Sequence, residues 1–319
     1  MGTGKGIRMI ELVAGVDGGG TKTRVILADG DGNHLADVTG AGSAMAPGRA
    51  DHSSEVIHSL IRQALTEAGV DEQRLKVLVA GVAGVGRESE TRALLASLED
   101  LEIAESVVVQ GDGEIALTDA FGPGAGIILI SGTGSIAYGR SPSRVLARCG
   151  GWGPAFGDEG SGAWIGRKAL AIVASAADGR EPPTALTGAV LTAAQVNEPA
   201  QLIPWGIAAK PSELAALAPV VFNAASAGDM RANALVGLAV EELVLHVRAL
   251  ALKLFGDERA AVPVAFSGGL LHKGSFLRKR LEQRLKSAVP GAQVRPSEII
   301  AARGAVRAAL MSLGAGSLG

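Results

Sequence analysis

The feature that most constrains the fold is a glycine- and threonine-rich turn between two apolar runs near the start of the chain. The first run ends at Asp17, and the turn Gly18-Gly19-Gly20-Thr21-Lys22-Thr23 joins it to a second run that closes on an Asp-Gly turn. This pattern predicts a β-hairpin over residues 12–32. Because glycines have no Cβ, the amide groups of the turn can approach a phosphate closely and donate hydrogen bonds to it.

The side chains around this first turn favour the same ligand. Thr21 and Thr23 offer hydroxyl donors, and Asp17 at the strand end can hold Mg²⁺ directly or through water. A solvent-exposed hairpin turn with no ligand can have the same composition. The turn alone therefore leaves phosphate binding and a plain surface turn as alternatives.

The pattern returns about one small domain later. Residues 126–140 again form an apolar run, a turn and a second run, with Gly132-Thr133-Gly134-Ser135 at the turn. Repetition of this unit indicates an internal duplication, although two unrelated hairpins would look similar. A duplication predicts two phosphate-binding turns that face each other across a cleft.

The segments after the first hairpin predict a three-layer α/β unit. Apolar spacing and capping residues give the following order: a third strand at 35–38, a helix capped by Asp51 or Ser53 and closed by Gly69, a strand at 75–82, a helix at 87–98, a strand at 107–109 and a helix at 114–120. Asp112 follows the last of these strands with a glycine on each side. Its carboxylate can accept a proton from a substrate, or it can cap the following helix.

The second half is predicted to be mostly helical around a second sheet. The predicted elements are an irregular glycine-rich segment that ends at Ser161, a helix from Ser161, mainly helices over 169–254, a strand at 262–266, a helix at 275–287 with a solvated charged face, a strand at 293–295 and a closing helix at 297–313. The predicted domains are 9–121, completed by 297–313, and 122–296, with a helical insertion around 165–255.

Two motifs in the second half could bind ligands. The glycine-rich segment places Asp158 and Glu159 beside aromatic residues, which favours a polar-ligand pocket, although a solvated loop or a helix N-terminal charge would also fit. Gly268-Gly269 follows a predicted parallel strand, where it would let a nucleotide lie against the backbone or would simply form a tight turn.

Composition excludes several classes of function. The net charge of −2, the pI near 6.2 and the 3% aromatic content argue against nucleic-acid and anionic-lipid partners. No apolar run reaches the ~20 residues of a membrane helix, and residues 1–8 do not begin a secretion signal. Cys149 is the single cysteine among 319 residues, so a cytoplasmic setting is expected, and the five histidines lack the spacing of a zinc site.

In this order, the motifs resemble the actin-like ATPase superfamily of sugar kinases, hexokinases and Hsp70 chaperones. Within it the chain is most similar to the N-acetylglucosamine/glucosamine kinases of the BadF/BadG/BcrA/BcrD group. The matching motifs are Gly15–Thr23 and Ile130–Ser135 for phosphate, Gly150–Gly153 with Gly157–Gly162 for the amino sugar, and Ser267–Leu270 for adenosine. The resemblance implies a duplicated actin-like (ribonuclease H-like) α/β fold, with two domains and an ATP/sugar cleft between them.

The resemblance also implies an ATP- and Mg²⁺-dependent kinase that phosphorylates the 6-hydroxyl of an amino sugar and forms a homodimer. Carried over by position, Asp17 would hold the metal, and Asp112 would contact the sugar and act as the catalytic base. The other implied sugar-site residues are Gly151, Trp152, Gly153 and Asp158. The implied ATP-site residues are Gly18, Gly19, Gly20, Thr21, Lys22, Thr23, Gly132, Thr133, Gly134, Ser135, Gly268 and Gly269.

Two departures keep the identity of the sugar open. Ala44 falls where N-acetylglucosamine kinases carry an Asn, and Ala83 falls near the position of a Ser, and both positions contact sugar in that family. Glucosamine is therefore an alternative to N-acetylglucosamine. Two other functions also compete: a non-catalytic sugar or nucleotide sensor, and a BadF-type ATPase activator, which would need more cysteines than one to ligate a cluster.

Overall fold

The computed structural model describes residues 11–70, 73–257 and 259–316, and the chain divides into two compact units. The first unit contains the chain up to Pro123 together with the segment that begins at Ile299, and the second unit is Gly124–Glu298. The predicted domain start at residue 9 and the segment 1–8 lie outside the described residues. The first unit is therefore built from two stretches that are far apart in the sequence.

The first unit has a five-stranded sheet in the order β3-β2-β1-β4-β5. Its strands are β1 (Leu12–Gly18), β2 (Lys22–Asp29), β3 (His34–Ala41), β4 (Leu75–Val82) and β5 (Ala104–Gly111). β1, β2 and β3 pair antiparallel, whereas β1, β4 and β5 run parallel. The Asp29 carboxylate accepts hydrogen bonds from the amides of Asp31 and Asn33, which stabilises the turn between β2 and β3.

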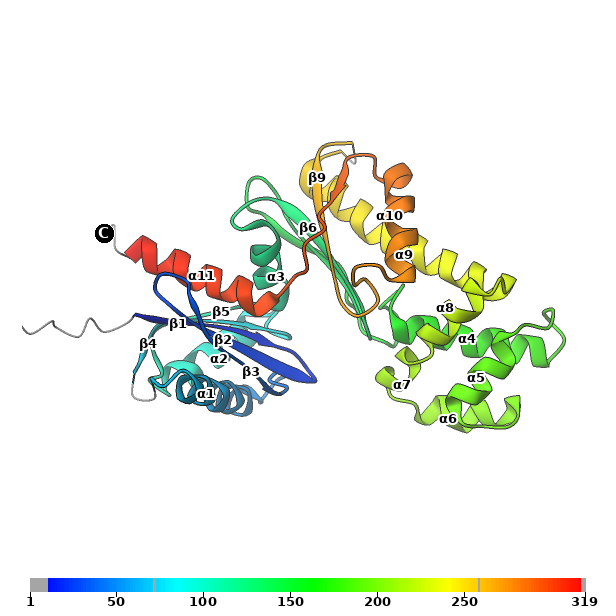
Figure 1. Cartoon of the computed structure of the whole chain (residues 1–319), viewed down its shortest axis with the longest axis horizontal. Helices are drawn as coiled ribbons and strands as arrows, with labels where there is room; N and C mark the ends of the chain where they lie inside the picture. The colour runs from blue at the N-terminus through cyan, green and yellow to red at the C-terminus, as the bar shows by residue number, and fades with distance from the viewer. Residues whose placement is uncertain (1–10, 71–72, 258, 317–319) are drawn as a thin grey trace, which may run out of the picture. The chain divides into compact units, whose positions relative to one another are not determined.

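Helices cover both faces of this sheet (Figure 1). α1 (Ala50–Glu67) and α2 (Glu88–Glu99) lie on one face, and α3 (Asp112–Phe121) and α11 (Ala301–Gly316) lie on the other. Side chains of β1 alternate between the two cores: Ala14 and Val16 pack with α1, and Val13 packs with α11. The result is the predicted three-layer α/β unit.

The second unit repeats this sheet, with strands in the order β10-β9-β6-β7-β8. Its strands are β6 (Gly126–Ser131), β7 (Ser135–Arg140), β8 (Leu146–Gly150), β9 (Val262–Ser267) and β10 (Ala292–Val294). β6, β7 and β8 pair antiparallel, and β6, β9 and β10 run parallel. Each strand therefore has a counterpart in the first unit, which confirms the predicted duplicated α/β fold.

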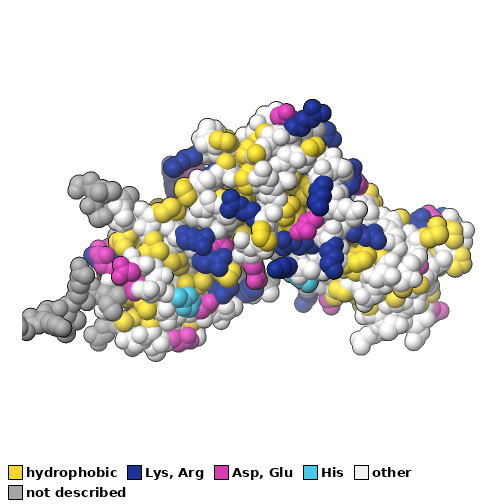
Figure 2. All heavy atoms as spheres, turned by 45° about the horizontal axis from the view of Figure 1, so that its top comes forward, with side chains coloured by type: hydrophobic (Ala, Val, Ile, Leu, Met, Phe, Trp, Pro, Cys, Tyr) yellow, Lys and Arg dark blue, Asp and Glu magenta, His cyan; other side chains and the backbone are white. Residues whose placement is uncertain are grey.

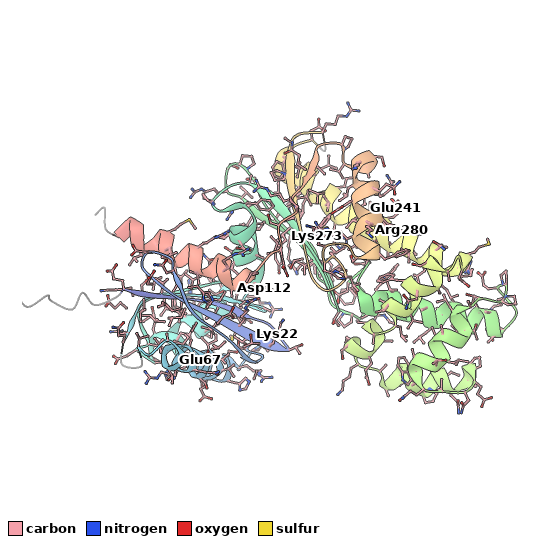
Figure 3. All side chains as sticks on the ribbon, viewed as in Figure 1. Lys22, Glu67, Asp112, Glu241, Lys273 and Arg280 are labelled. Atoms are coloured by element: carbon pink, nitrogen blue, oxygen red, sulfur yellow. The ribbon has the colours of Figure 1, made fainter. Side chains whose placement is uncertain are left out.

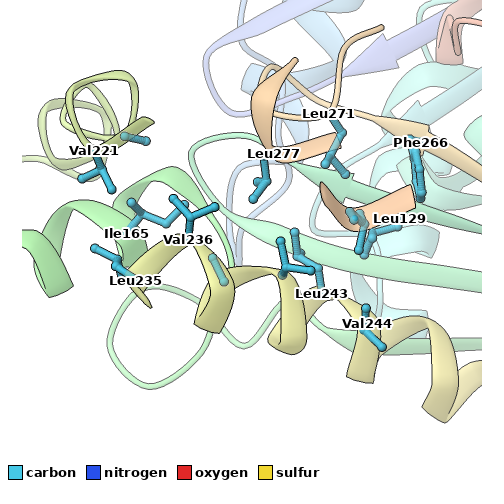
Figure 4. Packing of buried hydrophobic residues seen from close by; sticks show 14 of the residues in the cluster. Leu129, Ile165, Val221, Leu235, Val236, Leu243, Val244, Phe266, Leu271 and Leu277 are labelled. Atoms are coloured by element: carbon cyan, nitrogen blue, oxygen red, sulfur yellow. The ribbon is translucent and has the colours of Figure 1, made fainter. Parts of the chain in front are cut away.

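The helices of the second unit surround one hydrophobic core. They are α4 (Gly162–Ala177), α5 (Leu186–Ala194), η1 (Pro199–Gln201), α6 (Leu202–Ala208), α7 (Pro211–Ala215), α8 (Ala218–Ser226), α9 (Met230–Phe255) and α10 (Phe276–Ala288). Figure 4 shows Leu129 of the sheet, Ile165 of α4, and Val236 and Leu243 of α9 in this core. The hydroxyls of Ser161 and Ser275 cap α4 and α10 by accepting backbone N–H groups.

Several local predictions are wrong. Neither Asp51 nor Ser53 caps α1, because the helix already begins at Ala50 with Arg49 at the N-cap. Helix α3 begins at Asp112 and not at Glu114. Strand β8 was not predicted, because its five residues alternate between half-buried and exposed positions at a sheet edge and lack an apolar run.

The charges of α10 are not all solvated, because Arg278 is buried. Its guanidinium donates to the Glu282 carboxylate and the Leu271 carbonyl, and it lies 5.2 Å from the centre of the Phe266 ring. Helical spacing in the sequence did not indicate that the Arg278 guanidinium has partners inside the protein.

On the face of the molecule drawn in Figure 2, acidic and basic side chains are interspersed.

A buried carboxylate ties α3 to α11 in the first unit. Asp119 is fully buried, and its oxygens accept hydrogen bonds from the Ile300 amide at 2.8 Å and from two nitrogens of Arg303 at 2.7 Å. Arg307 lies 3.2 Å from the same carboxylate and donates to the Asp119 carbonyl. This cluster fixes where the distant segment rejoins the first unit.

We predict that Asp119→Asn destabilises the first unit by about 3 kcal/mol, because one partner of a buried ion pair is lost. Arg303 keeps 42% of its side chain exposed and can be rehydrated, which holds the loss near that value. Urea unfolding, with hydrogen exchange of α11 amides to identify the unit, measures the change. Asp178→Asn removes an exposed ion pair with Arg180 and should cost less than about 1 kcal/mol. Equal losses in the two variants would contradict the prediction.

Candidate active site

Two carboxylates lie at one edge of the first unit's sheet. Asp17 is near the end of β1, in register with Gly81 of β4, which is in register with Gln110 of β5. Asp112 comes directly after β5. Because β1, β4 and β5 run parallel, their carboxyl ends meet at this edge, where open α/β sheets bind ligands. Figure 3 shows Asp112 and Lys22 at the same end of this unit.

The two carboxylates interact electrostatically. Burial and, secondarily, the negative charge of Asp112 raise the pKa of Asp17 to about 6, while Lys22 and Arg24 oppose the shift. Such a pair of oxygen donors suits Mg²⁺, which would offset their repulsion. No three His, Cys, Asp or Glu side chains are grouped as a metal site within the described ranges. A Mg²⁺ ion at Asp17 would therefore need further oxygens from phosphate and water.

Asp112 is the first residue of α3, and Gly111 is at the N-cap. The Asp112 carboxylate accepts a hydrogen bond from the Gly113 amide at 2.9 Å. Capping of α3 was one of the two alternatives for Asp112 from the sequence. The N-cap is Gly111, so Asp112 does not hold that position. Asp112 is half-buried, at a position where a carboxylate favours the helix N-terminus electrostatically.

The first turn offers only part of the predicted set of phosphate donors. Gly20, Thr21 and Lys22 are exposed. Thr23 is completely buried, and its hydroxyl donates to the Ser43 hydroxyl at 2.8 Å. The expectation that Thr23 offers its hydroxyl to phosphate is therefore wrong for this conformation: it joins the turn to the loop after β3. The buried role of Ser43 was missed, because a serine in a loop of small residues carries no distinctive pattern.

The two positions that depart from the family pattern lie beside the first turn. The Ala44 amide donates to the Gly19 carbonyl at 3.1 Å, and the Ala83 amide donates to the Gly18 carbonyl at 2.8 Å. The Met45 amide in turn donates to the Ala83 carbonyl at 2.8 Å. The structure thus brings the first turn, Ala44 and Ala83 together at the edge that carries Asp17.

In the second unit, the turn between β6 and β7 is bonded to the glycine-rich segment. The Ser131 and Ser135 hydroxyls donate to the carbonyls of Gly160 and Glu159, at 3.0 and 2.7 Å. Gly162 donates its amide to the Gly132 carbonyl at 2.8 Å. Ser135 is buried and its hydroxyl is bonded within the protein, while its assignment to the ATP site stays a prediction. Thr133 remains exposed, and Gly132 and Gly134 are half-buried.

Asp158 lies against this second turn. It is nearly buried, has a positive φ of 59°, and would have its Oδ2 atom 3.1 Å from a Cβ placed on Gly134. A glycine at that position therefore leaves room for the carboxylate. The alternative of a solvated loop does not hold for Asp158, whereas Glu159 is half-buried.

The tandem glycines after β9 approach the same turn. Gly268 has a φ of 90°, and any Cβ there would collide with the Ser131 carbonyl oxygen, so the position requires glycine. The Leu270 amide donates to that carbonyl at 3.0 Å. Gly269 is exposed. The predicted second phosphate turn and the predicted adenosine motif are therefore in direct backbone contact.

The remaining predicted sugar residues follow β8. The Gly151 amide donates to the Ser135 carbonyl at 3.1 Å, and the Gly153 carbonyl accepts from the Gly157 amide at 2.9 Å. The Trp152 side chain is 62% exposed, with the Arg148 guanidinium 5.0 Å from its ring centre. The backbone of this segment thus lies beside Asp158, while the indole is open to solvent.

No helix among the described residues is both long and apolar enough to cross a bilayer.

Comparison with known proteins adds a family and named relatives. The profile of the BadF/BadG/BcrA/BcrD ATPase family matches residues 14–312. The N-acetylmuramic acid/N-acetylglucosamine kinase of Clostridium acetobutylicum is 30% identical, with 93% of this chain and 97% of the relative covered. The N-acetyl-D-glucosamine kinase of Dictyostelium discoideum is 29% identical, with coverage of 95% and 98%.

Solved structures agree with the fold. A Chromobacterium violaceum protein, proposed to be an N-acetylglucosamine kinase, superposes with a TM-score of 0.74 at 32% identity and covers 93% of this chain and 98% of its own. A ROK family glucokinase from Streptomyces griseus, in complex with glucose and AMPPNP, gives a TM-score of 0.57 at 16% identity, with coverage of 94% and 98%. The likeness to the glucokinase bears on the fold alone.

Proposed function

Because the chain belongs to the BadF/BadG/BcrA/BcrD ATPase family, we propose that it is an ATP-dependent amino-sugar kinase that phosphorylates the 6-hydroxyl of N-acetylglucosamine or glucosamine. The observation that carries the proposal is the pair of carboxylates, Asp17 and Asp112, at the carboxyl ends of parallel strands. One of them has a raised pKa because of burial and the charge of the other. Phosphoryl transfer needs such groups, whereas binding alone does not.

The chain's residues divide the work as follows. Asp112 accepts the proton of the sugar hydroxyl and directs its oxygen towards the phosphorus. Asp17 holds Mg²⁺, which offsets the phosphate charge when bound. Thr21 and Thr133, which are exposed, donate their hydroxyls to phosphate, and Lys22 adds positive charge. The backbone of the turns at Gly18–Gly20 and Gly132–Gly134 lies close to the phosphate groups. The backbone at Gly268 and Gly269 binds the nucleoside part of ATP.

We propose that Asp158 and the backbone of Gly151, Trp152 and Gly153 bind the sugar. The support is that Asp158 is nearly buried beside the second turn, and its carboxylate can accept hydrogen bonds from hydroxyls. The family resemblance and the single cysteine also lead us to propose a cytoplasmic homodimer. Size-exclusion chromatography with light scattering tests the dimer.

Asp158→Ala is expected to raise the sugar KM by roughly 10- to 100-fold, because a charge-assisted hydrogen bond to the sugar is worth about 1.5–3 kcal/mol. The KM for ATP should change little. Steady-state kinetics with each substrate varied in turn measures both. If a folded Asp158→Ala protein keeps the sugar KM and loses ATP affinity, Asp158 supports the neighbouring turn and not the sugar.

A panel of sugars assayed with ATP and Mg²⁺ tests the function itself. Glucosamine or N-acetylglucosamine should consume ATP far above the rate without sugar, with phosphate appearing on the 6-oxygen. Turnover of glucose and of neither amino sugar would refute the assigned substrate. Tight sugar binding without turnover would favour a non-catalytic sensor. Iron in the purified protein would favour an activator, although Cys149 is one thiol where a cluster needs several.

A further inference from the structure

A second feature of the glycine-rich segment lies beyond the proposed reaction. The residues around Asp158 also form one wall of an open hollow of about 380 Å³, and the first turns of α4 form the other wall. Phe156 and Glu159 come from the segment, and Trp164, Arg167 and Lys168 come from the helix. The hollow lies entirely within the second unit and is large enough for a sugar-sized ligand.

The hollow carries two cations, Arg167 and Lys168. Among the residues that the structure describes, no carboxylate lies within ion-pair distance of Arg167 or Lys168, although Glu159 lines the same hollow. The Lys168 ammonium lies 5.5 Å from the centre of the Trp164 ring. Arg167 is half-buried, so its guanidinium is partly desolvated, and within the described ranges no carboxylate is paired with it.

The apolar lining narrows the class of ligand. The Phe156 side chain lines the hollow and is 78% exposed, so its ring is accessible to a ligand. Trp164 forms part of the wall. Aromatic walls pack against the apolar face of a ring, a guanidinium pairs bidentately with a carboxylate or phosphate, and Glu159 can accept hydrogen bonds from hydroxyls. These are the requirements of an anionic sugar.

We propose that this hollow binds a sugar that carries a carboxylate or phosphate group, with Arg167 and Lys168 on the anion. The inference rests on the proposed function, because it places the hollow beside the sugar-binding segment. Two sources share this chemistry. One is an acidic substituent on the sugar that is phosphorylated, as in the N-acetylmuramic acid named for the C. acetobutylicum relative. The other is a sugar 6-phosphate, the product of the proposed reaction, bound as an effector.

The test is a calorimetric titration without ATP, which does not depend on turnover. The probes are N-acetylmuramic acid, N-acetylglucosamine 6-phosphate and neutral N-acetylglucosamine. Arg167→Met should weaken binding of at least one anionic sugar by roughly 10- to 100-fold and change the neutral sugar by less than about 2-fold. Arg167→Lys, which keeps the charge and loses the bidentate geometry, should give an intermediate loss.

Lys286→Met is the matched control. Lys286 is an exposed residue of α10, and the substitution removes one positive charge from the same unit without touching the hollow. Melting temperatures of all variants verify folding. Unchanged affinity for both anionic sugars in a folded Arg167→Met protein would overturn the proposal. Equal losses for anionic and neutral sugars would overturn it too, because Arg167 would then serve any sugar.

Kinetics separates the two sources. If the acid is a substrate substituent, Arg167→Met raises the KM for N-acetylmuramic acid and leaves that for N-acetylglucosamine unchanged. If the ligand is an effector, the sugar 6-phosphate inhibits the wild-type enzyme, and excess neutral sugar does not relieve this inhibition. Arg167→Met should then be insensitive to the 6-phosphate. Should no amino sugar be phosphorylated at all, the proposed function fails, while the titration still decides whether the hollow binds anionic sugars.

Discussion

Asp112→Asn is expected to lower kcat by about 10²–10⁴-fold, the range that general-base catalysis usually contributes. The substitution keeps the size of the side chain and one oxygen acceptor, so the hydrogen bond from the Gly113 amide can persist. Asn cannot take the proton of the sugar hydroxyl. ATP affinity should be unchanged and the sugar KM should stay within a few-fold, which steady-state kinetics and a melting curve would establish.

Glu114→Gln provides the matched control for this experiment. Glu114 lies in the same helical turn as Asp112, and its side-chain oxygen accepts the Gly111 amide, which a glutamine oxygen can also do. It removes the same unit charge near the N-terminus of α3 without removing the proposed base. A large drop in kcat for both variants would mean that charge at the helix terminus matters and not proton transfer. Normal turnover of Asp112→Asn would refute the base assignment.

Asp17→Asn is expected to stabilise the metal-free first unit at pH 7.5 by about 2–3 kcal/mol while it abolishes Mg²⁺-dependent turnover. The folded protein raises the pKa of Asp17 from 3.8 to about 6, mainly through burial. Keeping this carboxylate ionised therefore costs free energy above pH 6. The cost shrinks as the pH falls from 6 towards 3.8, because the folded protein binds the proton first, and it vanishes below 3.8, where the carboxylate is protonated in both states. The gain from Asp17→Asn should thus fall to roughly half at pH 5.

Asp37→Asn should show the opposite dependence on pH. The hydrogen bonds from Arg24, the largest cause, lower the pKa of Asp37. Its carboxylate therefore stabilises the folded protein above its unfolded pKa, and that stabilisation is lost as the pH falls through the folded pKa. Urea unfolding of both variants at two pH values, with and without Mg²⁺, measures the effects. If Asp17→Asn destabilises the metal-free protein at pH 7.5, burial is not the dominant influence on Asp17.

The parts of the fold that the sequence predicted are those with strong local patterns. The apolar runs at β1, β4, β6 and β9 are buried almost throughout, so their composition revealed them. Repetition of the glycine-threonine turn revealed the duplication. Strand β8 was not predicted, because the sequence of an edge strand with exposed alternate residues resembles that of a loop. The start of α1 was predicted wrongly, because its N-cap residue forms no side-chain hydrogen bond. Prediction of a helix start from sequence relies on a residue that can form such a bond.

The candidate site shows the same division. Asp17, Asp112, Asp158 and the tandem glycines were predicted as site residues from spacing and family resemblance, and these assignments stay predictions. The inward orientation of the Thr23 and Ser135 hydroxyls could not be predicted, because a hydroxyl in a turn can face either way. Its direction depends on Ser43 and Glu159, which are distant in sequence. The hollow beside Arg167 was missed for a similar reason. It requires α4 to fold back beside the residues that precede it.

The division of the first unit into two stretches has a consequence for synthesis on the ribosome. The residues of α11 emerge only after the whole of the second unit, Gly124–Glu298, has been made. At about 5–20 residues per second, that interval lasts roughly 10–35 s. Throughout it, Val13, Val79 and Ile115 lack the helix that covers them in the finished protein. We expect chaperones to bind a nascent chain in which this apolar face of the sheet is uncovered. The second unit can complete its folding before the first unit does.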